Sequence, residues 1–330
     1  KMQQANDTQT QSQTSALAQL REFSTIVADT GEIQSIEQFR PTDATTNPSL
    51  VLAAAQMPEY TSLLDDVIAH AKKQHGSRDQ RAAGAVDRLM TLFGRDITQI
   101  IPRYVSTEVD AHLSFDTEAT IAKGRDFIER YAQLGVDRDR VLIKIASTWE
   151  GIRAASVLEA EGIRCNLTLI FSLAQAMACF DAGVTLISPF VGRITDWYKA
   201  HDGVDAYTPE DDPGVASVRR IYSYAKAHAY PTQVMAASFR NSGQILALAG
   251  CDLLTISPKL LTELGASETQ VEHAIQSGAS AVDQRLAITE AQYRWRMTGD
   301  AMATEKLAEG VRKFAADQAQ LQALIAGRLD

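Results

Sequence analysis

Short apolar runs rich in β-branched residues alternate with longer amphipathic stretches along almost the whole chain. The short runs predict buried strands, and the stretches between them predict helices with one apolar face. The expected strands cover residues 25–29, 44–47, 104–109, 141–146, 165–170, 186–190, 233–238 and 253–257. The expected helices include residues 58–73, 116–134, 148–161, 173–182, 212–228 and 242–249. Regular alternation of strands and helices indicates a parallel sheet.

The number of strand–helix units decides the fold class. Eight units in one chain predict a closed (β/α)8 barrel of the TIM type. An open doubly wound sheet usually has a glycine-rich turn after its first strand, but here that strand ends in Ala-Asp-Thr-Gly. A long amphipathic helix is expected over residues 301–329, packed over the barrel or in a dimer contact. We therefore expect one barrel domain over residues 16–330, preceded by a flexible polar tail over residues 1–15.

Composition narrows the class of protein. The 330 residues are 45% hydrophobic and 22% charged, which is typical of a globular protein with a large core. The net charge of −9 argues against nucleic-acid or membrane partners, and no apolar stretch is long enough to cross a membrane. The first residues of the sequence contain no apolar run, so we expect no signal segment there. Three cysteines without a pairing motif, Cys165, Cys179 and Cys251, indicate reduced thiols and an intracellular location.

Lys144 is the most informative residue, because it interrupts the apolar run Val-Leu-Ile-Lys-Ile-Ala over residues 141–146. Burial disfavours the charged form of an amine. A neutral amine is a nucleophile that can attack a carbonyl carbon and form a Schiff base. The alternative is a lysine at a strand end that reaches water or pairs with a carboxylate. The strand alone leaves both interpretations open.

Polar residues share one face of most expected strands near the C-terminal ends, where barrel enzymes place catalytic groups. Lys144 shares its face with Leu142. The other candidates on such faces are Asp29, Thr45, Asn47, Glu108, Asn166, Thr168, Ser188, Phe190, Ser238 and Arg240, and Arg193 follows another strand end. Any one of them could be a helix cap or a loop residue. Together they make poor core packing and predict an active site.

One competing constellation is Glu108, Asp110 and His112, which alternate and are acceptable metal ligands. If all three lay on one face, a metal-dependent aldolase would be possible. Barrel strands are short, so we expect the strand to end before His112 and no metal to bind.

Six motifs together resemble the transaldolase family. They are D-A-T-T-N-P-S-L (43–50), S-T-E-V-D (106–110), V-L-I-K-I-A-S-T-W-E-G-I (141–152), C-N-L-T-L-I-F-S (165–172), I-S-P-F-V-G-R (187–193) and A-S-F-R-N (237–241). The resemblance runs from about residue 20 to the C-terminal helix. It implies transfer of a dihydroxyacetone unit from sedoheptulose 7-phosphate or fructose 6-phosphate to glyceraldehyde 3-phosphate or erythrose 4-phosphate. It also implies a cytoplasmic homodimer of the pentose phosphate pathway with no metal and no organic cofactor.

The resemblance assigns a role to each candidate. Lys144 attacks the C2 carbonyl of the donor, and Asp29 takes the proton from its C4 hydroxyl. Glu108 shuttles protons through a water held by Thr168 while the carbinolamine forms and dehydrates. The remaining contacts are Asn47 and Asn166 to the dihydroxyacetone hydroxyls, Ser188 and Thr45 as helpers in the same layer, and Arg193, Arg240 and Ser238 to the phosphate.

Phe190 separates group transfer from simple cleavage. The smaller fructose 6-phosphate aldolases that resemble this family have Tyr there, and a phenol could orient water near the carbanionic carbon. A phenyl ring keeps that spot dry, so we predict a transferase rather than an aldolase. The remaining alternative, a non-catalytic sugar-phosphate-binding barrel, has no need for Lys144, Asp29 and Glu108. The acidic segment 201–212 predicts a solvated loop near the phosphate end.

Overall fold

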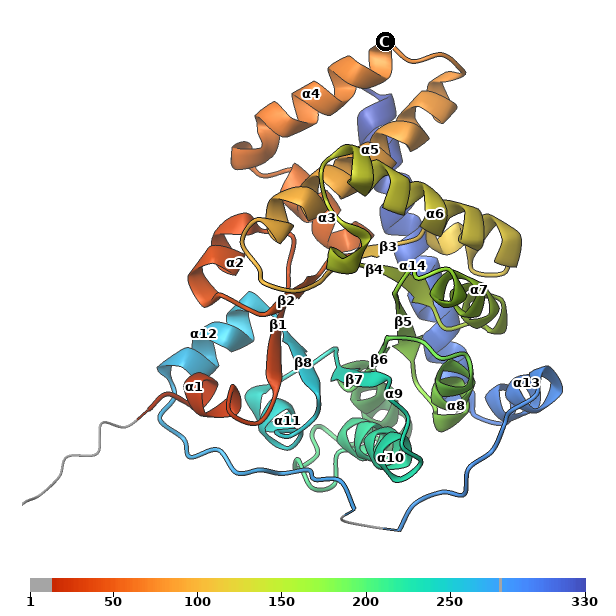
Figure 1. Ribbon diagram of the computed structural model, residues 1–330. Helices are drawn as coiled ribbons and strands as arrows, with labels where there is room; N and C mark the ends of the chain where they lie inside the picture. The colour runs from red at the N-terminus through yellow and green to blue at the C-terminus, as the bar shows by residue number, and fades with distance from the viewer. Residues whose placement is uncertain (1–13, 279–280) are drawn as a thin grey trace, which may run out of the picture.

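Eight parallel strands close into a barrel in chain order in the computed structural model, which describes residues 14–278 and 281–330. Strand β1 pairs with both β2 and β8, and this closes the ring (Figure 1). The strands are β1 (Thr25–Asp29), β2 (Asp43–Thr45), β3 (Val105–Glu108), β4 (Val141–Ala146), β5 (Cys165–Ile170), β6 (Leu186–Pro189), β7 (Gln233–Ala236) and β8 (Leu253–Ile256). The predicted (β/α)8 fold is confirmed.

Helices surround the barrel and cover its outer face (Figure 1). They are α1 (Ala16–Leu20), α2 (Ile33–Phe39), α3 (Pro48–Ala55), α4 (Thr61–Lys72), α5 (Arg78–Thr98), α6 (Thr117–Gln133), α7 (Trp149–Ala160), α8 (Leu173–Asp181), α9 (Gly192–Asp202), α10 (Pro213–Ala227), α11 (Ser242–Leu246), α12 (Pro258–Ala266), α13 (Glu290–Thr298) and α14 (Ala301–Ala326), with the short 3-10 helices η1 (Pro58–Tyr60), η2 (Ala111–Leu113) and η3 (Arg138–Arg140). The six helices expected from the sequence are present, the first as η1 followed by α4. None of the described helices is long and apolar enough to cross a membrane.

Several predicted strands were too long at their C-terminal ends, where a helix or an irregular backbone segment follows. Asn47, expected in a strand, instead caps α3 by accepting a hydrogen bond from the backbone nitrogen of Leu50 at 2.9 Å. Ser238 lies beyond β7 with a left-handed backbone, φ 62°. The alternation extrapolated through Ser238 was therefore wrong. Met235 points into the barrel, and Ala236 packs outward in the main core.

The barrel interior has an apolar floor. It consists of inward side chains from five strands, Val27, Leu142, Leu186, Met235 and Leu253. Two positions further along β1, β4, β6 and β8 the inward side chains are polar, as period-two alternation requires. The active-site candidates of these strands therefore stand directly above a packed floor.

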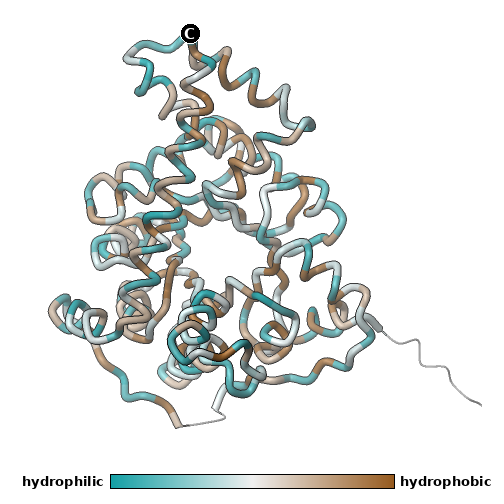
Figure 2. Tube along the Cα trace, turned by 180° about the vertical axis from the view of Figure 1, so that it is seen from behind, coloured by the Kyte–Doolittle hydropathy of each residue, from teal (hydrophilic) through white to brown (hydrophobic). Residues whose placement is uncertain are grey.

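The C-terminal helix α14 was predicted over residues 301–329 and ends at Ala326. It packs against α3, α5, α9 and β5, so the expected packing over the barrel is confirmed. Figure 2 shows its hydrophobic and hydrophilic positions interspersed along its length. Its last turns complete a second small core with α4 and α5 through Leu321 and Ile325.

Most of the predicted polar tail, residues 1–13, lies outside the described residues. Ser15, the last residue of that prediction, belongs to the folded part, because its hydroxyl caps α1 by accepting from the backbone nitrogen of Ala18 at 3.2 Å.

Candidate active site

A cavity of about 190 Å³ opens at the C-terminal ends of the strands. Its lining consists of Asp29, Thr45, Asn47, Lys144, Thr168, Ser188, Phe190, Arg193, Met235, Ala237, Ser238, Arg240, Thr255, Lys313 and Phe314. All the predicted site residues are in this set except Glu108 and Asn166. The position at the strand ends is where barrel enzymes carry their active sites.

Lys144 and Glu108 form a buried pair between neighbouring strands. They are register partners on β4 and β3, and Lys144 Nζ lies 3.8 Å from Glu108 Oε2. Their side chains are 7% and 2% exposed. Burial raises the pKa of Glu108 to about 7, against the opposing effect of the positive charges of Lys144 and Arg193. Lys144 thus pairs with a carboxylate, as expected for a structural lysine, and it also lines the cavity, as a nucleophile must.

Two buried oxygens, one in this pair and one on the neighbouring strand β5, have no hydrogen-bond partner among the described residues. They are Glu108 Oε2 and Thr168 Oγ1. Thr168 lies beside Ala146 in the register of β5 with β4, two residues beyond Lys144. Because buried polar groups are normally hydrogen-bonded, these oxygens are suited to a water or a substrate hydroxyl.

Asp29 is held at the cavity wall by its neighbours. Thr45 Oγ1 donates to Asp29 Oδ1 at 3.2 Å and lies 3.2 Å from Thr255 Oγ1. Thr255 was not among the predicted site residues. It could have been predicted, because side chains alternate along a strand and Thr255 lies two positions beyond the inward-facing Leu253.

Asn166 supports the cavity without lining it. Its amide accepts a hydrogen bond from Ser188 Oγ at 2.6 Å and donates to Ser106 Oγ at 3.1 Å. All three side chains are buried. Asn166 therefore fixes the rotamer of Ser188, which does line the cavity.

Aromatic rings hold a cation at the other end of the cavity. Phe190 packs edge-on against Phe171 with ring centres 5.3 Å apart. Arg193 Cζ lies 5.1 Å from the ring centre of Phe190 and 5.5 Å from that of Phe314, within the range of cation–π attraction. Burial and the nearby charge of Arg240 lower the pKa of Arg193. The guanidinium is therefore partly desolvated and suited to an anionic ligand.

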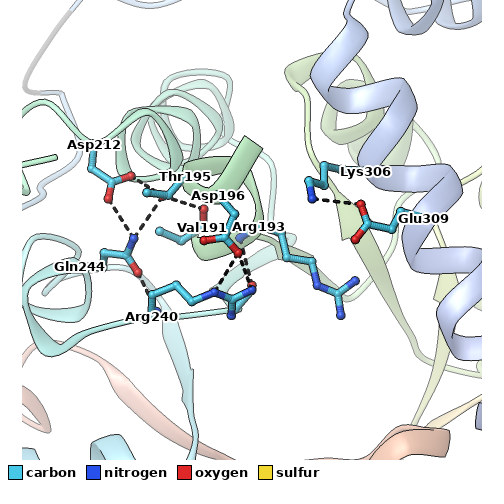
Figure 3. Close-up of polar contacts among 10 residues, drawn as sticks. Val191, Arg193, Thr195, Asp196, Asp212, Arg240, Gln244, Lys306 and Glu309 are labelled. Atoms are coloured by element: carbon cyan, nitrogen blue, oxygen red, sulfur yellow. Dashed lines mark hydrogen bonds and ion pairs between the residues drawn. The ribbon is translucent and has the colours of Figure 1, made fainter. Parts of the chain in front are cut away.

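Arg240 is fixed by a polar network that Figure 3 displays. Its Nε and Nη2 donate to Asp196 Oδ2 at 3.0 and 2.9 Å, and its backbone nitrogen donates to Gln244 Oε1 at 2.8 Å. Gln244 Nε2 in turn donates to Asp212 Oδ2 at 2.8 Å and Thr195 Oγ1 at 3.1 Å. The segment 201–212 is thus only partly the expected solvated loop, because Asp212 is buried within this network.

The ends of β6 and β7 approach closely. Ser238 Oγ accepts a hydrogen bond from the backbone nitrogen of Arg193 at 3.3 Å, and the backbone nitrogen of Gly192 donates to the carbonyl of Ser238. A side chain at position 192 would collide with that carbonyl. Gly192 therefore allows Arg193 and Ser238 to share the phosphate end predicted for them.

The two cavity residues from α14, Lys313 and Phe314, were missed by the sequence analysis. They lie in the pattern Arg-Lys-Phe-Ala-Ala of an ordinary amphipathic helix, far along the chain from any strand end. No local signal distinguishes them from surface and packing residues. Met235 and Ala237 were missed because the inward face of β7 was assigned to the wrong residues.

The structure contradicts the metal-site alternative. Strand β3 ends at Glu108, and Asp110 caps η2, where His112 is exposed and hydrogen-bonds Asp110 at 2.7 Å. Among residues 14–278 and 281–330, no three His, Cys, Asp or Glu side chains are placed to hold a metal ion.

The three cysteines are free and buried, away from the cavity lining. Burial raises the pKa of each of these thiols, which disfavours the reactive thiolate.

A closed (β/α)8 barrel with a polar cavity at its strand ends is the architecture of a barrel enzyme. The chain belongs to the transaldolase/fructose-6-phosphate aldolase family, whose model matches residues 26–325. The chain is 56% identical to the transaldolase of Methylobacillus flagellatus over 94% of its own length and 98% of that protein's. The transaldolase of Marinomonas sp. is 59% identical over 93% and 96% of the two chains, and that of Alteromonas mediterranea is 55% identical over 95% and 98%. These relatives support transaldolase function for this chain, which makes it a transferase.

Proposed function

We propose that this chain transfers a dihydroxyacetone unit between sugar phosphates through a Schiff base on Lys144. The donors are fructose 6-phosphate and sedoheptulose 7-phosphate, and the acceptors are erythrose 4-phosphate and glyceraldehyde 3-phosphate. The observation that carries the proposal is the buried Lys144–Glu108 pair, whose lysine lines the same cavity as Arg193 and Arg240. One end of the cavity is suited to a carbonyl group and the other to a phosphate.

Covalent attachment begins when Lys144 Nζ attacks the C2 carbonyl of the donor. Through a water held by Thr168, Glu108 gives a proton to the departing hydroxyl of the carbinolamine, so that this hydroxyl leaves as water and an iminium forms. A carboxyl group with a pKa of about 7 can both donate and accept protons near neutral pH. The water proposed for this relay would use the spare capacity of Glu108 Oε2 and Thr168 Oγ1.

Carbon–carbon cleavage follows when Asp29 takes the proton of the C4 hydroxyl. The C3–C4 bond breaks, its electrons pass into the iminium as an enamine, and the aldose phosphate leaves. An acceptor aldehyde is then attacked by the enamine carbon, and Asp29 returns the proton to the new hydroxyl. Hydrolysis of the resulting iminium frees Lys144 and the product ketose.

Binding roles follow from the positions of the remaining side chains. Asn47 and Ser188 line the reacting end and would bind the dihydroxyacetone hydroxyls, with Asn166 holding Ser188 in place. Arg193, Arg240 and Ser238 line the cationic end and would bind phosphate. Thr45 supports Asp29.

The reaction itself tests the proposal. Purified protein with fructose 6-phosphate and erythrose 4-phosphate is expected to form sedoheptulose 7-phosphate and glyceraldehyde 3-phosphate in equal amounts. With fructose 6-phosphate alone, turnover is expected to stop after about one equivalent of glyceraldehyde 3-phosphate per site. Continued release of free dihydroxyacetone at the same rate would instead identify an aldolase.

Replacing Phe190 with tyrosine is expected to raise the release of free dihydroxyacetone from fructose 6-phosphate. The phenol would bring a hydrogen-bonded water to a part of the cavity that the Phe190 and Phe171 rings keep apolar. Enzymatic measurement of dihydroxyacetone checks this, with Phe314→Tyr as a control that adds a phenol to the same cavity beside Arg193. No rise in Phe190→Tyr, or an equal rise in the control, would refute the role given to Phe190.

The oligomeric state, the location in the cell and the lack of a cofactor are further parts of the proposal. We propose a cytoplasmic homodimer of one barrel domain, residues 16–330, that needs no metal or organic cofactor and binds neither nucleic acid nor membrane. Light scattering of the purified protein would give the mass of two chains, and activity would survive dialysis against a chelator.

A further inference from the structure

Four cationic side chains line the cavity, and two of them have carboxylate partners. Lys144 pairs with Glu108, and Arg240 pairs with Asp196 at 2.9 Å. Within the described part of the chain, Arg193 and Lys313 form no ion pair. Asp29 also lines the cavity, so three carboxylates (Asp29, Glu108 and Asp196) stand against the four cations, and the remaining positive charge favours an anionic ligand.

The helix α14 brings Lys313 to the same end of the cavity as Arg193. A Cβ atom at Gly310 would lie 3.3 Å from Arg193 Nη1, and the centre of the Phe314 ring lies 5.5 Å from Arg193 Cζ. Residues 310 and 314 are one turn apart, so Arg193 rests on this face of the helix. Lys313 adjoins Phe314 and also lines the cavity. Figure 3 shows α14 passing opposite the guanidinium of Arg193.

Neighbouring cations on α14 are placed differently. Lys306 pairs with Glu309 at 3.0 Å, as Figure 3 shows, and it does not line the cavity. Arg312 is exposed, as Lys313 is, but it does not line the cavity. Among the described residues of α14, Lys313 is thus the cation that faces the ligand space.

We propose that Lys313 is a specificity-determining residue whose ammonium group binds the phosphate of donor and acceptor sugars. The proposal rests on the proposed function, since it assigns a third cation to the same phosphate end as Arg193 and Arg240. An ammonium group carries three donors on a flexible stem, so it can follow phosphates of different reach. The long C-terminal helix thereby takes part in recognition as well as in packing.

Lys313→Gln tests the proposal, with Arg312→Gln as the matched control that removes one charge from the adjacent, outward position. In Lys313→Gln the KM for fructose 6-phosphate and for erythrose 4-phosphate is expected to rise about five- to tenfold. The kcat is expected to stay within about twofold, because the contact is equal in ground and transition states. The KM for unphosphorylated fructose is expected not to change, and Lys313→Arg is expected to restore most of the affinity.

Inorganic phosphate separates this proposal from the proposed function, because it can bind the phosphate end without any reaction. Its binding, followed by calorimetry without any substrate, is expected to weaken about five- to tenfold in Lys313→Gln and to stay unchanged in Arg312→Gln. Weaker binding in Lys313→Gln alone would support Lys313 even if the protein catalysed no transfer. Unchanged phosphate binding and KM in Lys313→Gln would overturn the proposal, as would an equal loss in Arg312→Gln, which would indicate the general field of the helix.

Discussion

Replacing Lys144 with alanine is expected to lower kcat by about 10⁴-fold or more, because the nucleophile and its part in proton transfer vanish together. Fold stability should change little in comparison, since Glu108, left without its partner, can stay protonated in its buried position. Steady-state assay with fructose 6-phosphate and erythrose 4-phosphate measures the loss, and circular dichroism confirms the fold.

Lys144→Arg is the stringent companion variant. It keeps the positive charge next to Glu108 but cannot form a Schiff base at neutral pH. Equal inactivity of the two variants would assign the effect to the amine rather than to the charge. Turnover by either variant at a rate near that of the wild type would contradict covalent catalysis. Unchanged affinity in both, without turnover in the wild type, would indicate the binding-protein alternative.

Replacing Glu108 with glutamine is expected to lower kcat by about 10²-fold or more, the usual contribution of a positioned acid or base. Size and hydrogen bonding are preserved, but the side chain can no longer exchange a proton with the carbinolamine. KM should change little, because Glu108 does not line the ligand space. A kcat within twofold of the wild type would refute the role of Glu108.

The pH profile sharpens this prediction. Burial raises the pKa of Glu108 from 4.5 to about 7. As the pH rises through about 7, the carboxyl loses the proton that it gives to the departing hydroxyl. The rate of carbinolamine dehydration, and with it kcat, is therefore expected to fall. This inflection should be absent from the residual activity of Glu108→Gln. An identical inflection in both proteins would assign it to another group.

Thermal unfolding gives an independent check of the same pKa. Because the folded-state pKa of Glu108 is raised, its protonated form contributes stability that is fully present below about pH 4.5 and lost as the pH rises through about 7. The Tm of the wild type minus the Tm of Glu108→Gln should therefore be larger at about pH 5 than at about pH 8. A difference in Tm that does not vary with pH would contradict the raised pKa.

The barrel and its reacting end could be predicted from the sequence because both obey local periodicity. Side chains alternate strictly along β4, so Lys144 had to stand two positions above Leu142 and its apolar floor. The same reasoning placed Asp29 above Val27. The apolar runs that form the strands are short and clearly bounded. The positions of all eight strands could therefore be predicted along the chain.

The phosphate end could be predicted less completely, because tertiary contacts and irregular backbone position it. The left-handed backbone of Ser238 ends the alternation that had been extended through β7. Gln244 and Asp212 meet only when the segments after α9 and β7 fold together. Lys313 reaches the cavity because of the path of α14, which no periodicity in its own sequence specifies.

Borohydride trapping tests the central claim most directly. The protein is incubated with fructose 6-phosphate, reduced, digested and analysed by mass spectrometry. The account predicts a reduced dihydroxyacetone adduct on Lys144 and on no other lysine, including Lys313, and discharge of the adduct when erythrose 4-phosphate is added before reduction. An active protein with no adduct on Lys144, or with the adduct on a different lysine, would contradict it.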